Sequence, residues 1–274
     1  ASNLEKKIKN ELLDMLNNQR ETYEKFYENF GLQLKWGIYR EFGLNREMLL
    51  PLLMFHSSKE KKLVTMSEYF ERMQPEQKYI YYASGENVDR IDRLPQTELL
   101  KDKDLEILYL TDEIDEFALK ILRVYEDKEF KSVSSGDLGL EDEGDDQSAQ
   151  EQSQEYQPLL DFMKEALSGK VKAVRLSQRL KSHPVCLSSE GMVSLEMEKI
   201  LNSMPTDREV KAERILEINS CHPIFQTLQK LHTEDQDRLK LYTEVIYNQA
   251  LLIEGLNIED PVAFSNAVCD IMAG

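Results

Sequence analysis

The hydrophobic positions between residues 235 and 272 repeat at the three- and four-residue spacing of an α-helix. One stripe along this expected helix comprises Leu239, Tyr242, Ile246, Gln249, Ile253 and Leu256. A second stripe of Leu241, Val245 and Leu252 lies beside it, so the helix is apolar over more than one face. Asp260 and Pro261 then predict another helix, because aspartate caps helix starts and proline fits the first helical turn.

This helical hairpin has two interpretations, because a helix that is apolar nearly all round must be buried on both sides. Periodicity alone favours the central core helix of a monomer. The position at the end of the sequence favours a dimer seam, in which each subunit supplies two helices to a four-helix bundle. The expected dimer contacts are the first stripe and the apolar positions of the second helix, Phe264, Val268, Ile271 and Met272.

The first part of the chain predicts helices followed by a small αβα unit. Residues 4–42 have a helical pattern, and their aromatic stripe of Tyr23, Phe26, Tyr27 and Phe30 indicates core packing. A shorter helix is expected over residues 46–54, and Thr65 with Glu68 predicts a capping box. From about residue 78, short β-prone runs at 79–82, 106–110 and 130–133 alternate with helical stretches. This alternation is typical of a parallel sheet covered by helices.

Residues 137–157 are acidic and rich in glycine, serine and glutamine, which indicates a linker or charged loop. We therefore expect one domain over residues 1–136 and a second over residues 158–274. The second domain has strand patterns at 171–177, 184–188 and 214–219, and we expect the second of these to be the hairpin partner of the first. The predicted fold class is thus α/β followed by α+β, ending in the helical hairpin.

Composition narrows the possible partners and the cellular location. The chain has 34 basic and 51 acidic residues and a net charge of −17, which argues against nucleic acid or an anionic membrane as the main partner. Its longest apolar run, residues 48–55, is too short to span a bilayer, and its polar start does not resemble a signal peptide. An odd number of cysteines, 3, without a close pair indicates reduced thiols and a cytoplasmic protein.

The sequence makes a weak case for an enzyme. It contains no phosphate-binding glycine motif and no common hydrolase or zinc motif, and adjacent Cys221 and His222 lack the further ligands that zinc requires. We therefore predict no catalytic residue, cofactor site or metal site.

One other element stands out between Met192 and Met204. Its apolar face is either ordinary core or an adaptable binding surface of the kind that methionine favours, comprising Val193, Met197, Ile200, Leu201 and Met204.

Several motifs together resemble the heat-shock protein 90 chaperones. Those similar to the middle domain of that family are Phe26-Tyr27, Phe30-Gly31, Phe55-His56-Ser57-Ser58, Ser67-Glu68-Tyr69, Arg72-Met73 and Ile80-Tyr81-Tyr82. Those similar to its C-terminal domain are residues 174–180, His183-Pro184, Leu216-Glu217-Ile218-Asn219, His222-Pro223, Tyr247-Asn248-Gln249-Ala250-Leu251, Gly255 and Asp260-Pro261. The resemblance covers nearly the whole chain in order and is greatest to the bacterial, cytosolic type.

The resemblance implies a fragment that joins the last part of the middle domain to the dimerisation domain. In that family ATP and Mg belong to an N-terminal domain that this sequence does not contain, so we expect the fragment neither to bind nor to hydrolyse ATP. The resemblance further implies a homodimer through a four-helix bundle, unfolded client proteins as partners, and co-operating chaperones. Other classes that remain open are a dimeric scaffold for folded partners and an α/β enzyme.

The resemblance also implies where clients bind. One set of positions is on the methionine-containing helix, at Val193, Met197, Ile200 and Leu201. A second patch matches Glu116, Phe117 and Lys120. Here the chain departs from the family pattern, since Phe117 stands where a tryptophan is common and Lys120 where a polar amide can occur.

Overall fold

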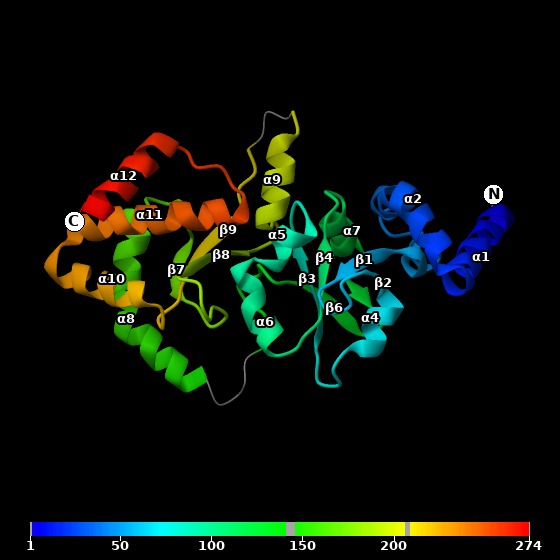
Figure 1. The fold of residues 1–274 in the computed structure, drawn as a ribbon, viewed down its shortest axis with the longest axis horizontal. Helices are drawn as coiled ribbons and strands as arrows, with labels where there is room; N and C mark the ends of the chain where they lie inside the picture. Colours follow the sequence, from blue (N-terminus) through cyan, green and yellow to red (C-terminus); the bar gives the residue numbers. More distant parts are fainter. Residues whose placement is uncertain (1, 141–145, 206–208, 274) are drawn as a thin grey trace. The chain divides into compact units, whose positions relative to one another are not determined.

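The chain folds into two compact units in a computed structural model that describes residues 2–140, 146–205 and 209–273. The first unit comprises residues 1–93 and 100–133, and the second comprises residues 94–99 and 134–274 (Figure 1). The chain passes from the first unit to the second at residues 133–134, and the predicted linker over residues 137–157 falls in the second unit. Residues 94–99 also belong to the second unit, although no pattern in the sequence indicated this.

The first unit begins with two helices, α1 (Ser2–Asn18) and α2 (Arg20–Arg40), which are separated at Gln19. Tyr23 and Tyr27 are buried, and their hydroxyls donate hydrogen bonds to the carbonyl oxygens of Leu52 at 2.5 Å and Met54 at 2.9 Å. Phe30 is exposed, so the prediction that the whole aromatic stripe enters the core is wrong at that position. The buried stripe of α2 continues from Tyr27 through Gly31, Lys35 and Ile38, and Phe30 lies beside it.

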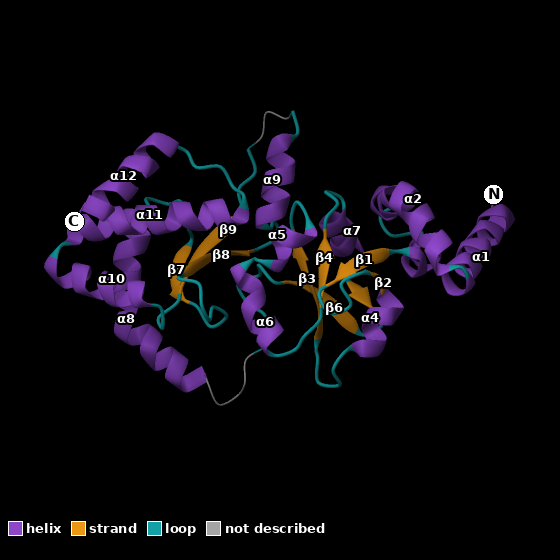
Figure 2. Cartoon of the chain, viewed as in Figure 1, coloured by secondary structure: helices purple, strands orange, loops and turns teal. Residues whose placement is uncertain are grey.

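A six-stranded sheet forms the centre of the first unit, in the order β2-β1-β4-β3-β6-β5 (Figure 2). The strands that the sequence predicted are β3 (Tyr79–Ser84), β4 (Ile107–Leu110) and β6 (Lys128–Ser132), and they are parallel to one another. The sequence did not predict the antiparallel strands β1 (Met54–Ser57), β2 (Leu63–Thr65) and β5 (Val124–Tyr125), which extend both edges. The sheet is therefore mixed.

Short helices connect and cover these strands. The expected helix over residues 46–54 is instead α3 (Arg46–Leu49) and the 3-10 helix η1 (Leu50–Leu52), since the chain enters β1 at Met54. The remaining helices that lie wholly or partly in this unit are α4 (Met66–Arg72), α5 (Val88–Asp92), α6 (Glu98–Asp102) and α7 (Asp115–Leu122). The predicted capping box is confirmed at α4, where Thr65 accepts from the Glu68 amide and Glu68 from the Thr65 amide.

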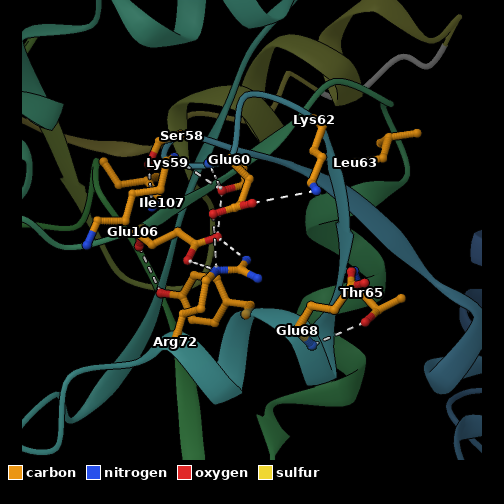
Figure 3. Close-up of polar contacts among 12 residues, drawn as sticks. Ser58, Lys59, Glu60, Lys62, Leu63, Thr65, Glu68, Arg72, Glu106 and Ile107 are labelled. Carbon is orange, nitrogen blue, oxygen red and sulfur yellow. Dashed lines mark hydrogen bonds and ion pairs between the residues drawn. The ribbon is translucent and has the colours of Figure 1, made fainter.

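Buried ion pairs fasten the elements of the first unit to one another. The guanidinium of Arg72 on α4 binds both carboxylate oxygens of Glu106, at 2.9 and 2.6 Å, just before β4 (Figure 3). A second cluster joins α2 to the start of α7: the Nζ of Lys35 lies 2.7 Å from carboxylate oxygens of Asp112 and Asp115. Burial opposes the charge on Lys35, but Asp115 and Asp112 outweigh it and raise the Lys35 pKa.

The second unit contains a three-stranded sheet in the order β7-β9-β8. Its strands are β7 (Ala173–Leu176), β8 (Val185–Glu190) and β9 (Glu213–Ile218). The predicted hairpin of the first two strands is wrong, because β9 lies between them, parallel to β7 and antiparallel to β8. The central position suits β9, whose Ile215, Leu216 and Ile218 are all fully buried.

The helices of the second unit that follow residue 140 are α8 (Asp146–Ala166), α9 (Leu195–Ser203), α10 (Pro223–Glu234), α11 (Gln236–Glu254) and α12 (Pro261–Ala273). The acidic stretch 137–157 is not wholly a linker or loop, because α8 begins at Asp146 and continues through Pro158. Its C-terminal half is anchored in the core by Leu159, Leu160 and Met163. Residues 141–145 of the expected linker lie outside the described part of the chain.

Residues 94–99, including the 3-10 helix η2 (Pro95–Thr97), pack into the second unit through polar contacts. The buried Gln96 side chain donates to the Leu187 carbonyl oxygen at 2.7 Å and to the Glu254 carboxylate. Glu98 accepts hydrogen bonds from the backbone amide of Lys181 at 2.6 Å and from the amide and hydroxyl of Ser182. Burial opposes the Glu98 carboxylate, but these hydrogen bonds outweigh it and lower the Glu98 pKa to about 2.

Thr65→Ala should lower the free energy of unfolding of the first unit by about 1 kcal/mol, because it removes one half of the capping box at α4. The measurement is urea unfolding followed by the fluorescence of Trp36, which is the 1 tryptophan of the chain and lies in this unit. Ser67→Ala, an exposed change in the first turn of the same helix, is the matched control and should change stability little. Equal unfolding midpoints for the two variants would contradict the role given to Thr65.

Glu98→Gln should destabilise the second unit at neutral pH, and the deficit should shrink as the solution becomes acidic. The folded-state pKa of about 2 is below the ordinary value of 4.5, so the stability gained from the Glu98 carboxylate is complete above pH 4.5. It is lost as pH falls towards 2. Urea unfolding followed by circular dichroism, at about pH 6 and about pH 3, tests this. If the free energy of unfolding differs between parent and variant by the same amount at both pH values, stability is not linked to protonation of Glu98.

Candidate functional site

The helix α11 places much of its expected dimer stripe inside its own unit. Leu239, Ile246 and Leu256 are buried among the side chains of the second core within a single chain. Burial of this kind favours the interpretation of these positions as core, and their contact with a second chain stays a prediction. Tyr242 is half-buried and packs against the same core, Ile253 is half-buried, and Gln249 is exposed. Periodicity shows which side of a helix is apolar, but it does not show whether that side packs against the same chain or against a second chain.

The helix α12, unlike α11, leaves its apolar side chains largely accessible. Its sequence is mostly apolar, but none of its described residues is buried. Val262 is 70% exposed and Met272 is 80% exposed, while Phe264, Val268 and Ile271 are half-buried. Leu252, on the neighbouring helix α11, is 50% exposed. We call Leu252, Ile253 and the apolar residues of α12 the terminal hairpin surface.

The ends of this hairpin are firmly defined by local chemistry. Gly255 adopts a positive φ of 74° and closes α11 with a left-handed residue, which glycine does without steric cost. The Asp260 carboxylate accepts hydrogen bonds from the amides of Val262 at 3.0 Å and Ala263 at 2.9 Å, so the predicted cap of α12 is confirmed. The exposed apolar surface is thus part of an ordered helix.

A cavity of about 1590 Å³ lies among α9, α11, α12 and the strand edges of the second unit. Its walls carry charged groups, but several of these are paired with one another. The Nζ of Lys170 lies 3.1 Å from the Glu244 carboxylate, and the guanidinium of Arg214 is paired with Glu198. Leu241, Val245 and Phe264 supply apolar lining. Ala263, Phe264 and Ala267 of α12 also line this cavity.

The predicted client positions on α9 divide into covered and accessible ones. Ile200 is only 6% exposed, so it contributes little accessible surface to the predicted client site. Val193 packs against the second core, whereas Met197 and Leu201 are half-buried and Met204 is exposed. Met192, which was not among the predicted contacts, is also exposed. It precedes α9 and was missed because it lies outside the helical stripe.

The predicted client patch on α7 also divides. Glu116 is 2% exposed and accepts a hydrogen bond from the Tyr82 hydroxyl at 3.2 Å, so its carboxylate contacts its own unit. Phe117 is half-buried, and its ring lies 6.0 Å from that of Tyr39 in an edge-to-face arrangement. Lys120 is half-buried, and burial lowers its pKa. Phe117 is thus partly accessible at this patch, whereas the Glu116 carboxylate is hydrogen-bonded within the unit.

The described residues, 2–140, 146–205 and 209–273, offer neither a cluster of metal ligands nor a helix that could cross a membrane. Among them, no three or more histidine, cysteine or acidic side chains gather closely enough to hold a metal ion. Over the same described residues, every helix is too short or too polar to cross a lipid bilayer.

Comparison with known proteins gives the family. The family model described as "Hsp90 protein" matches residues 2–274. A "Chaperone protein HtpG" from Bacillus subtilis is 57% identical over 272 residues, which cover 99% of this chain and 44% of that relative. Proteins with the same description from Clostridium botulinum and Alkaliphilus oremlandii are 56% and 57% identical, each again over 44% of the relative's length. The chain therefore spans less than half of these relatives, and it belongs to the Hsp90 family.

Proposed function

We propose that this chain supplies the dimerisation and client-binding functions of an HtpG-type chaperone. The observation that carries the proposal is the helix α12, which is apolar along its length and buries none of its described side chains in its own unit. In this proposal residues 1–136 act as the last part of the middle domain and residues 158–274 as the dimerisation domain. Nucleotide-driven steps belong to parts of the relatives that this chain does not match.

Dimerisation would cover the terminal hairpin surface. An exposed apolar helix costs free energy in water, at roughly 25 cal/mol for each Å² of apolar surface that stays uncovered. A second copy of the chain offers the same surface, and a two-fold axis lets each hairpin cover the other as a four-helix bundle. The contacts are those of the hairpin that remain accessible: Gln249, Leu252, Ile253, Val262, Phe264, Val268, Ile271 and Met272.

Client binding would use the accessible apolar positions of α9 and α7. Met197, Leu201 and Met204 lie on or directly after α9, where flexible thioether side chains adapt to varied apolar segments. Phe117 supplies an aromatic contact in the first unit. Each contact alone is weak, but a dimer presents every contact twice, so an unfolded chain gains from a high effective concentration. Homodimer, unfolded clients, co-operating chaperones and a cytoplasmic location all remain predictions.

Leu252→Asp combined with Met272→Asp should convert a dimer into a folded monomer. Both side chains are at least half exposed, so the changes leave the core intact while placing two charges per chain in the proposed bundle. Molar mass by light scattering across a dilution series, together with circular dichroism, provides the measurement. Met192→Asp, an exposed methionine outside the hairpin, is the matched control and should stay dimeric. A parent chain that is monomeric throughout the series would contradict the proposal.

Met197→Ser combined with Leu201→Ser should weaken suppression of client aggregation about fivefold, equivalent to about 1 kcal/mol. The two side chains are one helical turn apart on α9, and the change removes their apolar surface without adding charge. The measurement is the chain concentration that halves aggregation of a thermally unfolded test protein. Ile8→Ser, which removes an exposed apolar side chain from α1, controls for general loss of surface hydrophobicity. Equal activity of both variants would exclude α9 as the client site.

A further inference from the structure

The helix α9 contacts its own unit through its polar side. Residues three and four apart share one face of a helix, and one face of α9 carries Glu198, Lys199 and Asn202. All three line the cavity of the second unit. Met197 and Leu201 lie on the other side of the helix and are half-buried. An amphipathic helix usually covers its apolar side, so specific contacts must hold α9 in this orientation.

The Glu198 carboxylate provides the most buried of these contacts. It accepts a hydrogen bond from the Ala212 amide at 2.8 Å, just before β9, and it is paired with the Arg214 guanidinium on β9. Arg214 in turn donates to the Tyr247 hydroxyl at 2.7 Å on α11. Glu198 is buried, and a buried charge without its partners is costly. This group therefore fixes the rotation of α9 about its own axis.

Two further polar contacts act in the same direction. The Asn202 side chain donates to the Val210 carbonyl oxygen at 2.8 Å and accepts from the Val210 amide at 2.8 Å. The Nζ of Lys199 donates to the Glu254 carbonyl oxygen at 2.9 Å, at the end of α11. Of the α9 residues, Leu195 alone belongs to the buried core cluster of the unit. The helix is therefore attached to its unit largely through its polar side.

The cavity beside α9 offers a competing cover for the apolar side. Its volume is about 1590 Å³, and Leu241, Val245 and Phe264 give it apolar walls. A typical small-molecule pocket has roughly 300–1,000 Å³, so this cavity has room for the side chains of a helical turn. If α9 turned about its axis, its apolar side chains would enter this space and leave water, which is favourable. The polar contacts and the cavity thus favour opposite orientations of one helix.

We propose that Glu198, Lys199 and Asn202 are positioning residues of the client site, which hold the polar side of α9 against the unit and so keep Met197 and Leu201 accessible. When these contacts are released, α9 turns and buries both apolar side chains in the adjoining cavity. The inference rests on the proposed client binding at α9 and adds the residues that control it. A client meets only the fraction of chains whose apolar side faces outward, so its apparent affinity falls in proportion to that fraction.

Glu198→Gln combined with Asn202→Ala should weaken suppression of client aggregation about fivefold, although the apolar side chains of α9 are unchanged. Glutamine fills the same space but has no charge for Arg214, and alanine cannot bind Val210. Asn202→Ala alone, at an exposed position, should show a smaller loss and decides the test if the combined variant does not fold. Glu244→Gln, which removes another paired carboxylate from the cavity wall, is the matched control and should act like the parent.

The orientation of α9 can be followed by the rate at which a maleimide reagent modifies Met197→Cys. The exposed natural thiols are first removed by Cys221→Ser and Cys269→Ser, which leaves the buried Cys186. In the combined variant, labelling should slow by the same factor as suppression weakens. Both measurements report the fraction of chains whose apolar side faces outward. A purely structural role for the polar contacts would instead loosen α9 and make labelling faster.

The outcomes separate this inference from the proposed function. Slower labelling with an equal loss of suppression is the expected result. Unchanged or faster labelling overturns the inference alone, provided that Met197→Ser with Leu201→Ser still weakens suppression. Slower labelling with unchanged suppression would mean that α9 turns but does not bind clients, so the proposed client site and the inference fail together. A loss of suppression in Glu244→Gln as large as that in the combined variant would also overturn the inference.

Discussion

The need to cover an apolar helix governs the second unit. Some apolar residues of the α11–α12 hairpin are buried and others are exposed. Leu239, Ile246 and Tyr247 of α11 lie in the core. The same helix leaves Leu252 exposed, and α12 follows with exposed Val262 and Met272. The core cluster of this unit contains residues of β9, α8 and α10, and none from α12. Its apolar surface stays in water unless a further protein surface covers it.

Polar chemistry, in contrast, is used mainly for construction. Arg72 and Glu106, Lys35 and Asp115, and Arg214 and Glu198 are pairs in which at least one partner is buried, and each pair ties together separate elements. Breaking such a pair leaves a buried charge without a partner, which is costly, so these residues are committed to the fold. Large apolar side chains are also exposed on α12, next to α9 and at the turn after α2, for example Val262, Met192 and Phe42. Such exposed apolar surfaces suit a protein that binds other polypeptides.

Local patterns in the sequence predicted local structure well. The capping box at Thr65 and the cap at Asp260 were predicted correctly because each depends on neighbouring residues. The parallel strands β3, β4 and β6 were predicted from the alternation of short β-prone runs with helical stretches. The errors arose where distant residues decide. The partner of β7 is β9 and not the next strand along the chain, and the acidic start of α8 is helical despite its composition. Short edge strands such as β2 and β5 carry too few residues for an alternating pattern.

The candidate site shows the same limit. Helical spacing correctly grouped Ile200 with Met197 and Leu201, but it could not show that Ile200 is covered. Glu116 was placed on the correct helix, yet its carboxylate is taken by Tyr82 from a neighbouring strand. Sequence patterns therefore proposed the surfaces, whereas the structure shows which of the proposed residues are accessible.

The most direct test of the account is whether a second chain covers α12. Hydrogen–deuterium exchange of the amides in residues 261–273, measured over a range of protein concentrations with the molar mass recorded alongside, addresses this. The account predicts that these amides become protected in step with dimer formation, while amides of β9 exchange slowly at every concentration. Fast exchange in α12 at concentrations where the chain is dimeric would contradict it, because the dimer would then form through another surface.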